Sequence, residues 1–271
     1  MTLPRRSLLP ALAAPFLIGA PSVRAANVAP VVVGGTGGAL AALRTVAIWF
    51  TEETGIPVTV LPSLGTEGGL RATADGKLHV GVIGRVLTEA DLARGVSGPQ
   101  VWRVPLGFVT SFEQPRAIAI GDLAGFIGDP ASVWPGGTKL RPILRPPSES
   151  DYPILVRHVP GMEAALARLR RRPELPVATN DQDALDLAEQ MEGSIVSTTL
   201  AQIISEGRNL RFVPLNGIMP SVDALASGAY PLAKPLQLIR SQRTPPQGDR
   251  FIDYLRSAEG QTRLSRIGCL V

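Results

Sequence analysis

The chain has 271 residues, of which 45% are hydrophobic and 18% charged, with 28 Gly and 25 Pro. This composition excludes an intrinsically disordered protein and indicates a loop-rich globular one. The formal net charge of +4 would suit a nucleic-acid partner, but much of it lies at the start of the chain. Cys269 is the single cysteine, which excludes an internal disulfide and a zinc site built from cysteines.

Residues 1–25 have the pattern of a secretory signal peptide. Arg5 and Arg6 precede an apolar stretch that is too short to span a membrane as a stable helix, and residues 23–25 fit a small-x-Ala cleavage site. The arginine pair resembles a twin-arginine signal, and an ordinary signal peptide is the alternative. Cleavage near Ala25 would remove three arginines and no acid, so the net charge would fall from +4 to +1. The sequence thus predicts a periplasmic protein with no nucleic-acid partner and no direct membrane anchor.

Strand and helix signals alternate in the first part of the predicted mature chain. Strands are predicted over 28–33, 56–61 and 78–83, separated by helices over 39–54 and 70–75. Gly55 ends the first of these helices. A β-α-β-α-β order of this kind indicates a parallel sheet covered by helices.

The pattern is coarser beyond residue 100. A connecting strand is predicted over 104–110, and residues 121–150 are rich in Gly and Pro. The elements expected after them are helices over 163–172 and 181–191, strands over 177–179 and 194–198, and helical segments around 251–255 and 260–266. The arginines at 168 and 170–172 indicate either an anion patch or a solvated helix C-terminus, where cations suit the helix dipole.

Three junctions combine hydroxyl groups with glycine or arginine: Gly35–Gly38, Gly65–Gly69 and Arg145–Ser150. The first two precede predicted helices, where backbone N–H groups are free to bind an anion. If the three converge, they offer the donors that a desolvated tetrahedral oxyanion needs. The alternative is that they are turn glycines and helix caps without a ligand.

Signals of catalysis are weak. His79 and His158 have no His or Cys partner at metal-ligand spacing, and there is no nucleophile-elbow motif. Cys269 is interpreted as a small buried hydrophobe. The sequence therefore predicts no enzyme activity, cofactor or metal, with an enzyme using Cys269 or a carboxylate in the cleft as the alternative.

The ordered series of motifs resembles type II periplasmic binding proteins, most closely the phosphate-binding components of ABC transporters. The stretches that carry the resemblance are residues 56–92, 144–151, 177–201, 215–239 and 251–271. They match that family's first βαβ half, its Arg-x-x-Ser anion loop, a following helix and strand, a "GAYPLAKPL"-type returning strand and a closing "FIDYLRSAEGQ"-type helix. The resemblance covers nearly the whole predicted mature chain.

This resemblance implies an α/β fold of two lobes, each a mixed sheet flanked by helices, with a cleft between the lobes. Lobe one would comprise residues 27–107 plus 233–271, and lobe two residues 108–232. The strands that cross between lobes would lie near Leu106–Thr110 and Pro231–Ile239. The implied function is capture of phosphate, or a related tetrahedral oxyanion, and its delivery to an ABC permease. A sensory or adaptor protein on the same fold is the alternative.

The resemblance also implies a set of ligand-binding residues: Thr36, Gly37, Thr66, Gly68, Arg145, Ser148, Glu149 and Ser150. Two positions depart from the family pattern. Gly84 stands where phosphate binders place an aspartate that accepts the ligand's proton, and Glu149 stands where they place a glycine. Glu149 or Glu67 is expected either to replace that acceptor or to face solvent. Arg85 is expected either to add positive charge to the cleft or to lie on the surface.

Overall fold

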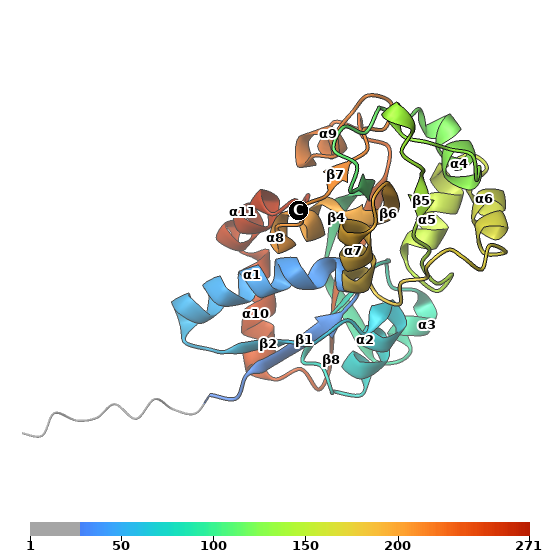
Figure 1. Ribbon diagram of the computed structural model, residues 1–271. Coiled ribbons are helices and arrows are strands. Elements are labelled where there is room, and N and C mark those ends of the chain that lie inside the picture. The colour runs from blue at the N-terminus through green and yellow to red at the C-terminus, as the bar shows by residue number, and fades with distance from the viewer. Residues whose placement is uncertain (1–27) are drawn as a thin grey trace, which may run out of the picture.

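The computed structural model describes residues 28–271 (Figure 1). The predicted signal peptide and its arginine pair lie outside the described residues. Among the residues described, no helix is both long and apolar enough to cross a membrane.

The first half of the described chain alternates strands and helices. Its elements are β1 (Val31–Gly35), α1 (Gly37–Thr54), β2 (Val58–Val60), α2 (Gly65–Ala74), β3 (Val80–Ile83), α3 (Glu89–Leu92), β4 (Val96–Thr110), α4 (Ile120–Gly128), a 3-10 turn (Pro135–Gly137) and β5 (Arg141–Pro142). The pairing of β1 with both β2 and β3 is parallel, which confirms the expected β-α-β-α-β unit.

The second half is richer in helices. Its elements are α5 (Asp151–His158), α6 (Met162–Leu169), α7 (Asp181–Gln190), β6 (Ser194–Thr199), α8 (Leu200–Glu206), β7 (Arg211–Phe212), α9 (Val222–Ala226), β8 (Ala233–Ser241), α10 (Pro246–Arg256) and α11 (Ala258–Arg266). As expected, Asn180 caps α7, because its side chain accepts a hydrogen bond from the Asp183 N–H.

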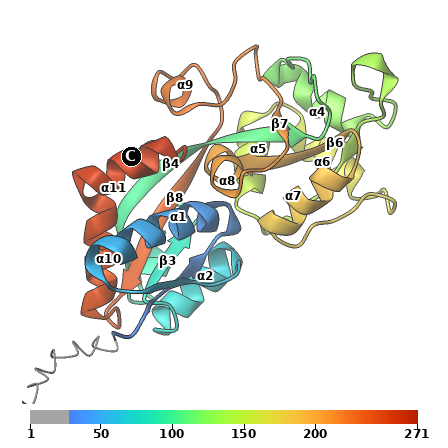
Figure 2. The same ribbon diagram turned by 60° about the vertical axis from the view of Figure 1, so that its left-hand side comes forward.

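The long strands β4 and β8 hold the two lobes together. Within the described residues, the strands form one mixed eight-stranded sheet in the order β2-β1-β3-β8-β4-β6-β5, with β7 also paired to β4. Residues 96–105 of β4 pair with β8, and residues 106–109 pair with β6. Figure 2 shows β4 and β8 running from the side of α10 and α11 toward β6 and β7. One strand therefore belongs to the sheets of both lobes.

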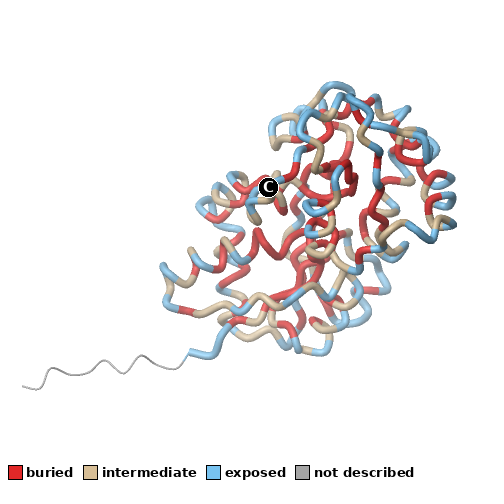
Figure 3. The backbone as a smooth tube through the Cα atoms, in the orientation of Figure 1, coloured by how far each residue is buried: buried red, intermediate tan, exposed pale blue. Residues whose placement is uncertain are grey.

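Each lobe has its own hydrophobic core. One cluster joins α1, β1, β3, α10 and α11 around Phe50, Trp102 and Phe251, and the second gathers under α4, α5 and α6 around Trp134. In Figure 3 the buried segments, drawn in red, run through the interior of the molecule. Except for Ala201 of α8, the first cluster draws on residues 31–104 and 236–269, while the second draws on 106–232. The lobe boundaries expected at 107/108 and 232/233 remain a prediction that this distribution supports.

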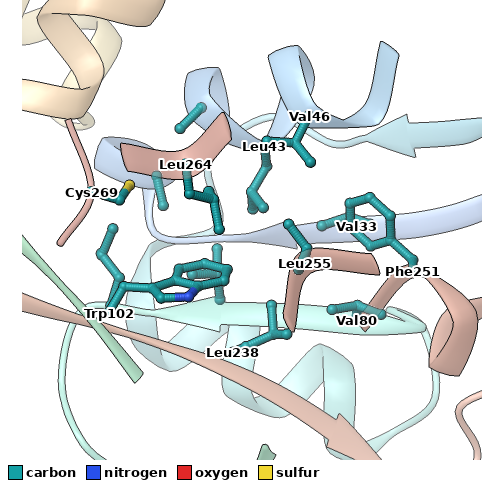
Figure 4. Close-up of a cluster of buried hydrophobic side chains, with 14 of the residues drawn as sticks. Val33, Leu43, Val46, Val80, Trp102, Leu238, Phe251, Leu255, Leu264 and Cys269 are labelled. Atoms are coloured by element: carbon teal, nitrogen blue, oxygen red, sulfur yellow. The ribbon is translucent and has the colours of Figure 1, made fainter. Parts of the chain in front are cut away.

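Cys269 lies in the first of these clusters, close to Trp102 and Leu264 (Figure 4). Burial raises the pKa of its thiol to about 12. A thiol that stays protonated inside an apolar core is a packing group, and it lacks the thiolate that a nucleophile needs.

Three predicted elements differ from the structure. The strand expected over 177–179 is only an isolated bridge between Val177 and Leu144, and β4 begins eight residues earlier than expected. The helix expected to start at Leu70 begins at Gly65, so the glycines of "GTEGG" form its first turns. Gly69 serves close approach, because a Cβ on it would lie 2.7 Å from the Gly35 Cα of β1.

We predict that Gly69→Ala lowers the free energy of unfolding by about 1–3 kcal/mol, since α2 would have to move away from β1. The matched control is Gly125→Ala in α4, where a Cβ would meet nothing and would raise the stability by up to about 1 kcal/mol. Urea unfolding of both variants measures the difference. Equal stability of the two variants would contradict the close-approach explanation.

Candidate functional site

A continuous chain of contacts links the three glycine and hydroxyl junctions. Gly37, at the start of α1, packs so tightly on Asp181 that a Cβ there would overlap the carboxylate. Asp181 Oδ1 accepts a hydrogen bond of 3.2 Å from Arg145 Nη1, and Arg145 Nη2 lies 3.0 Å from Glu149 Oε2. The loop after β5 therefore touches the N-terminus of α1 through the start of α7.

The second junction joins through Gly84, directly after β3. The Gly84 N–H donates to Thr66 Oγ1 at 3.0 Å, and a Cβ on Gly84 would overlap the side chain of Ser150. The Lys234 side chain lies on the same side, with its Cε 2.9 Å from that Cβ position. An aspartate at residue 84 would thus displace Ser150 or Lys234, which explains why glycine stands there.

Several polar atoms in this region are buried and have no hydrogen-bond partner. They are Thr36 Oγ1, Ser150 Oγ and Arg145 Nε; Arg145 Nη2 makes no well-directed hydrogen bond either, and its one close acceptor is Glu149 in the ion pair above. Thr36 precedes α1 but its side chain makes no capping bond. The edge formed by Nε and Nη2 is the one that grips a carboxylate or phosphate with two parallel hydrogen bonds. Because an unsatisfied buried donor costs about 1–3 kcal/mol, such a concentration indicates a place for an acceptor.

A fully buried ion pair, between Lys234 and Asp151, lies next to this region. Lys234 Nζ of β8 donates to Asp151 Oδ1 at 2.5 Å, and Asp151 Oδ2 accepts from Ser197 Oγ at 3.1 Å. Burial raises the pKa of Asp151, but the Lys234 ammonium outweighs it and holds that pKa below its usual range. Burial alone would lower the pKa of Lys234. The negative charge of Asp151 outweighs this effect of burial, so the pKa of Lys234 is raised. Both groups are therefore charged at neutral pH.

The ion pair between Glu149 and Arg145 differs from the pair between Lys234 and Asp151. Burial raises the pKa of Glu149, and the nearby Asp181 and Asp151 carboxylates raise it as well. The positive charge of Arg145 lowers it, but by less than these effects together. Burial lowers the pKa of Arg145, but its acidic neighbours raise it above its usual value. Glu149 thus takes up a proton more readily than an ordinary glutamate does, because its pKa is raised.

The structure separates the predicted site residues into two groups. Gly37, Arg145, Glu149 and Ser150 come together in the contacts above, Thr36 directly precedes Gly37, and Thr66 joins them through Gly84. Ser148 is exposed, and Gly68 lies against Leu64 at the start of its own helix. The assignment of all eight residues to a ligand remains a prediction.

The structure distinguishes between the alternatives for Glu67 and Glu149, and between those for Arg85. Glu67 is half exposed and pairs with Arg85 at 2.7 Å, and Arg85 also pairs with Asp91, so both lie in a surface network. The side chain of Glu149 is only 15% exposed and faces Arg145. The clustered arginines near α6 are likewise peripheral, with Arg172 paired to Glu174 and Arg170 stacked over Tyr152.

The sequence analysis missed three charged residues of the cluster: Asp151, Asp181 and Lys234. Lys234 carried a usable signal, since it interrupts the mostly apolar segment 231–239 and is fully buried. Asp181 was interpreted only as part of a helix start, where an acid suits the dipole without any further role.

Comparison with known proteins identifies the family. Residues 20–259 match the PBP superfamily domain. The chain belongs to this superfamily. No curated protein matches it by sequence.

Solved structures share the fold at low sequence identity. A putative phosphate ABC transporter substrate-binding protein from Clostridium perfringens, with bound phosphate, has a TM-score of 0.75 at 12% identity over 89% of this chain and 99% of its own. PEB3 of Campylobacter jejuni with L-phospholactate has a TM-score of 0.59 at 16% identity, over 89% and 99%. The effector-binding domain of QuiR with shikimate has 0.52 at 13%, over 89% and 97%. These likenesses establish the two-lobed type II periplasmic-binding-protein fold.

We predict that Lys234→Met lowers the free energy of unfolding by about 3–5 kcal/mol, because it leaves the Asp151 carboxylate buried without its partner. The control is the double variant Lys234→Met/Asp151→Leu, which removes both charges and should be clearly more stable than the single variant. Urea unfolding near neutral pH, where both groups are charged, measures both. A double variant no more stable than the single one would contradict this account.

Proposed function

We propose that the protein captures phosphate, or a related tetrahedral oxyanion, in the cleft and delivers it to an ABC permease. The observation that carries this proposal is the set of unpartnered buried atoms of Thr36, Ser150 and Arg145, which come from different lobes of the fold. An oxyanion bound between them would satisfy all of these atoms at once, and each charge-assisted hydrogen bond contributes about 1.5–3 kcal/mol.

The neighbouring structures support the ligand class. The protein with a TM-score of 0.75 was solved with phosphate, and PEB3 with L-phospholactate, which also carries a phosphate group. The signal-peptide pattern of residues 1–25 supports an exported, periplasmic location. A role as a sensor or adaptor, in which the liganded surface is read by a receptor, uses the same site and remains the alternative.

Binding of the ligand would draw the lobes together at the start of α1. Two hydrogen bonds already join the lobes there, from Gln182 Nε2 to the Gly37 carbonyl at 3.2 Å and from Thr199 Oγ1 to the Gly38 carbonyl at 3.0 Å. The α1 N-terminus also directs its first backbone N–H groups and the positive end of its dipole toward the cluster. A closed form stabilised in this way is what a permease would recognise.

Titration calorimetry of the anion-free protein with phosphate and then sulfate tests the proposal. We predict that phosphate binds and that Ser150→Ala weakens its binding about tenfold or more, since the Ser150 hydroxyl is buried and lacks a partner. The matched control, Ser148→Ala, changes the affinity less than about twofold, because that hydroxyl is exposed. Binding of neither anion would refute the proposed function, and equal effects of the two variants would refute the assignment of Ser150.

A second prediction concerns pH and Glu149. An anion beside Glu149 would raise its pKa further above the value in the free protein, so binding is accompanied by proton uptake. Affinity should therefore increase as the pH is lowered from about 8 to about 5. In Glu149→Gln this part of the pH dependence disappears, and the comparison cancels the titration of phosphate itself. Parallel pH profiles for the two proteins would contradict a role for Glu149 at the site.

A further inference from the structure

A second feature of lobe two adjoins the proposed anion site. It is a cavity of about 50 Å³ enclosed by α5, α6 and the ends of β5 and β6. Its lining is largely apolar and includes Leu155, Met162, Leu166 and Ile195. Four of its lining residues are polar or charged: Arg145, Glu149, Asp151 and Ser197.

The polar residues that line the cavity belong to the charged cluster described above. Arg145 and Glu149 make the ion pair described above, and Asp151 accepts from Ser197 and Lys234. A chance packing defect in a hydrophobic core would be apolar on all sides. This cavity is lined by both apolar and charged residues, and one of them, Arg145, carries the buried Nε donor that has no partner.

The arrangement is complementary to an amphipathic anion. The oxyanion group would bind the Nε–Nη2 edge of Arg145, and a short apolar substituent would extend into the cavity. An engineered apolar cavity of about 150 Å³ binds benzene, so in proportion a cavity of about 50 Å³ accommodates roughly two carbon atoms.

We propose that this cavity is a second subsite, and that the protein binds oxyanions with a short alkyl substituent, such as small alkylphosphonates, in addition to the unsubstituted ion. This inference rests on the proposed function, because the charged end of the ligand uses the same Arg145. The outer wall, with Tyr152, Leu166 and Arg170, is only half buried, so small shifts of α5 and α6 suffice to admit the substituent.

Calorimetric titration with phosphate, methylphosphonate, ethylphosphonate and phenylphosphonate tests the inference. Ethylphosphonate should bind about fourfold more tightly than methylphosphonate, the gain expected for one further buried carbon. Phenylphosphonate should bind more weakly than ethylphosphonate, because its ring exceeds the cavity. The charged group is the same throughout this phosphonate series, so the differences report the substituent alone.

The cavity itself is tested with Leu166→Phe, which fills it from the half-buried side. This variant should abolish the gain of ethyl over methyl while changing the affinity for phosphate by less than twofold. The matched control is Leu175→Phe, a half-buried position on the same core that does not line the cavity, and it should keep the gain. If Leu166→Phe does not fold, the ligand series with the unaltered protein decides alone.

The outcomes separate this inference from the proposed function. If phosphate binds and ethylphosphonate binds no more tightly than methylphosphonate, the subsite is refuted and the proposed function stands. Retention of the ethyl gain in Leu166→Phe also refutes the subsite. If the protein binds neither phosphate nor any phosphonate, both proposals fail.

Discussion

The buried pair between Lys234 and Asp151 is the interaction on which the candidate site depends. Lys234 belongs to β8, one of the two long strands that join the lobes, and Asp151 is the first residue of α5. The pair therefore fixes the start of α5 against the centre of the sheet. Because Glu149 and Ser150 directly precede Asp151, their positions follow from the same contact, as does the path of the loop that carries Arg145.

Glycine at two positions lets lobe one pack closely on lobe two at this loop, and a third glycine acts within lobe one. Gly84 leaves the space that Ser150 and Lys234 fill, Gly37 leaves the space that Asp181 fills, and Gly69 brings α2 against β1. In the sequence, Gly37 and Gly69 belonged to candidate anion-binding turns, and Gly84 stood where phosphate binders place an aspartate. In the structure their common property is the lack of a Cβ at a close contact, and only Gly37 also lies at a helix N-terminus that faces the charged cluster.

Much of the fold was predictable because it depends on local patterns. The parallel unit around β1, the capped start of α7 and the amphipathic α10 and α11 follow from periodicity and from cap residues, which act over a few positions.

The site was predictable in outline, since Thr36, Arg145 and Ser150 belong to recognisable junctions. The charged partners were not predictable in the same way: Lys234 lies 83 residues from Asp151, and Asp181 lies 36 from Arg145, distances at which sequence pattern carries no information on contact. The exposure of Ser148, two residues from the buried Ser150, depends on the exact turn of the loop.

The charges of the cluster constrain how it can hold an anion. Two cations, Arg145 and Lys234, face three carboxylates, Asp151, Asp181 and Glu149, so the cations are already neutralised within the protein. Net positive charge therefore cannot be the source of affinity. What remains are directed donors: the unpartnered Nε of Arg145, the two orphaned hydroxyls and the N–H groups at the start of α1, which act at short range in a buried site. A site of this kind selects by the placement of hydrogen bonds, and it tolerates a carboxylate neighbour when the neighbour is easily protonated. Glu149 is the residue whose environment meets that condition.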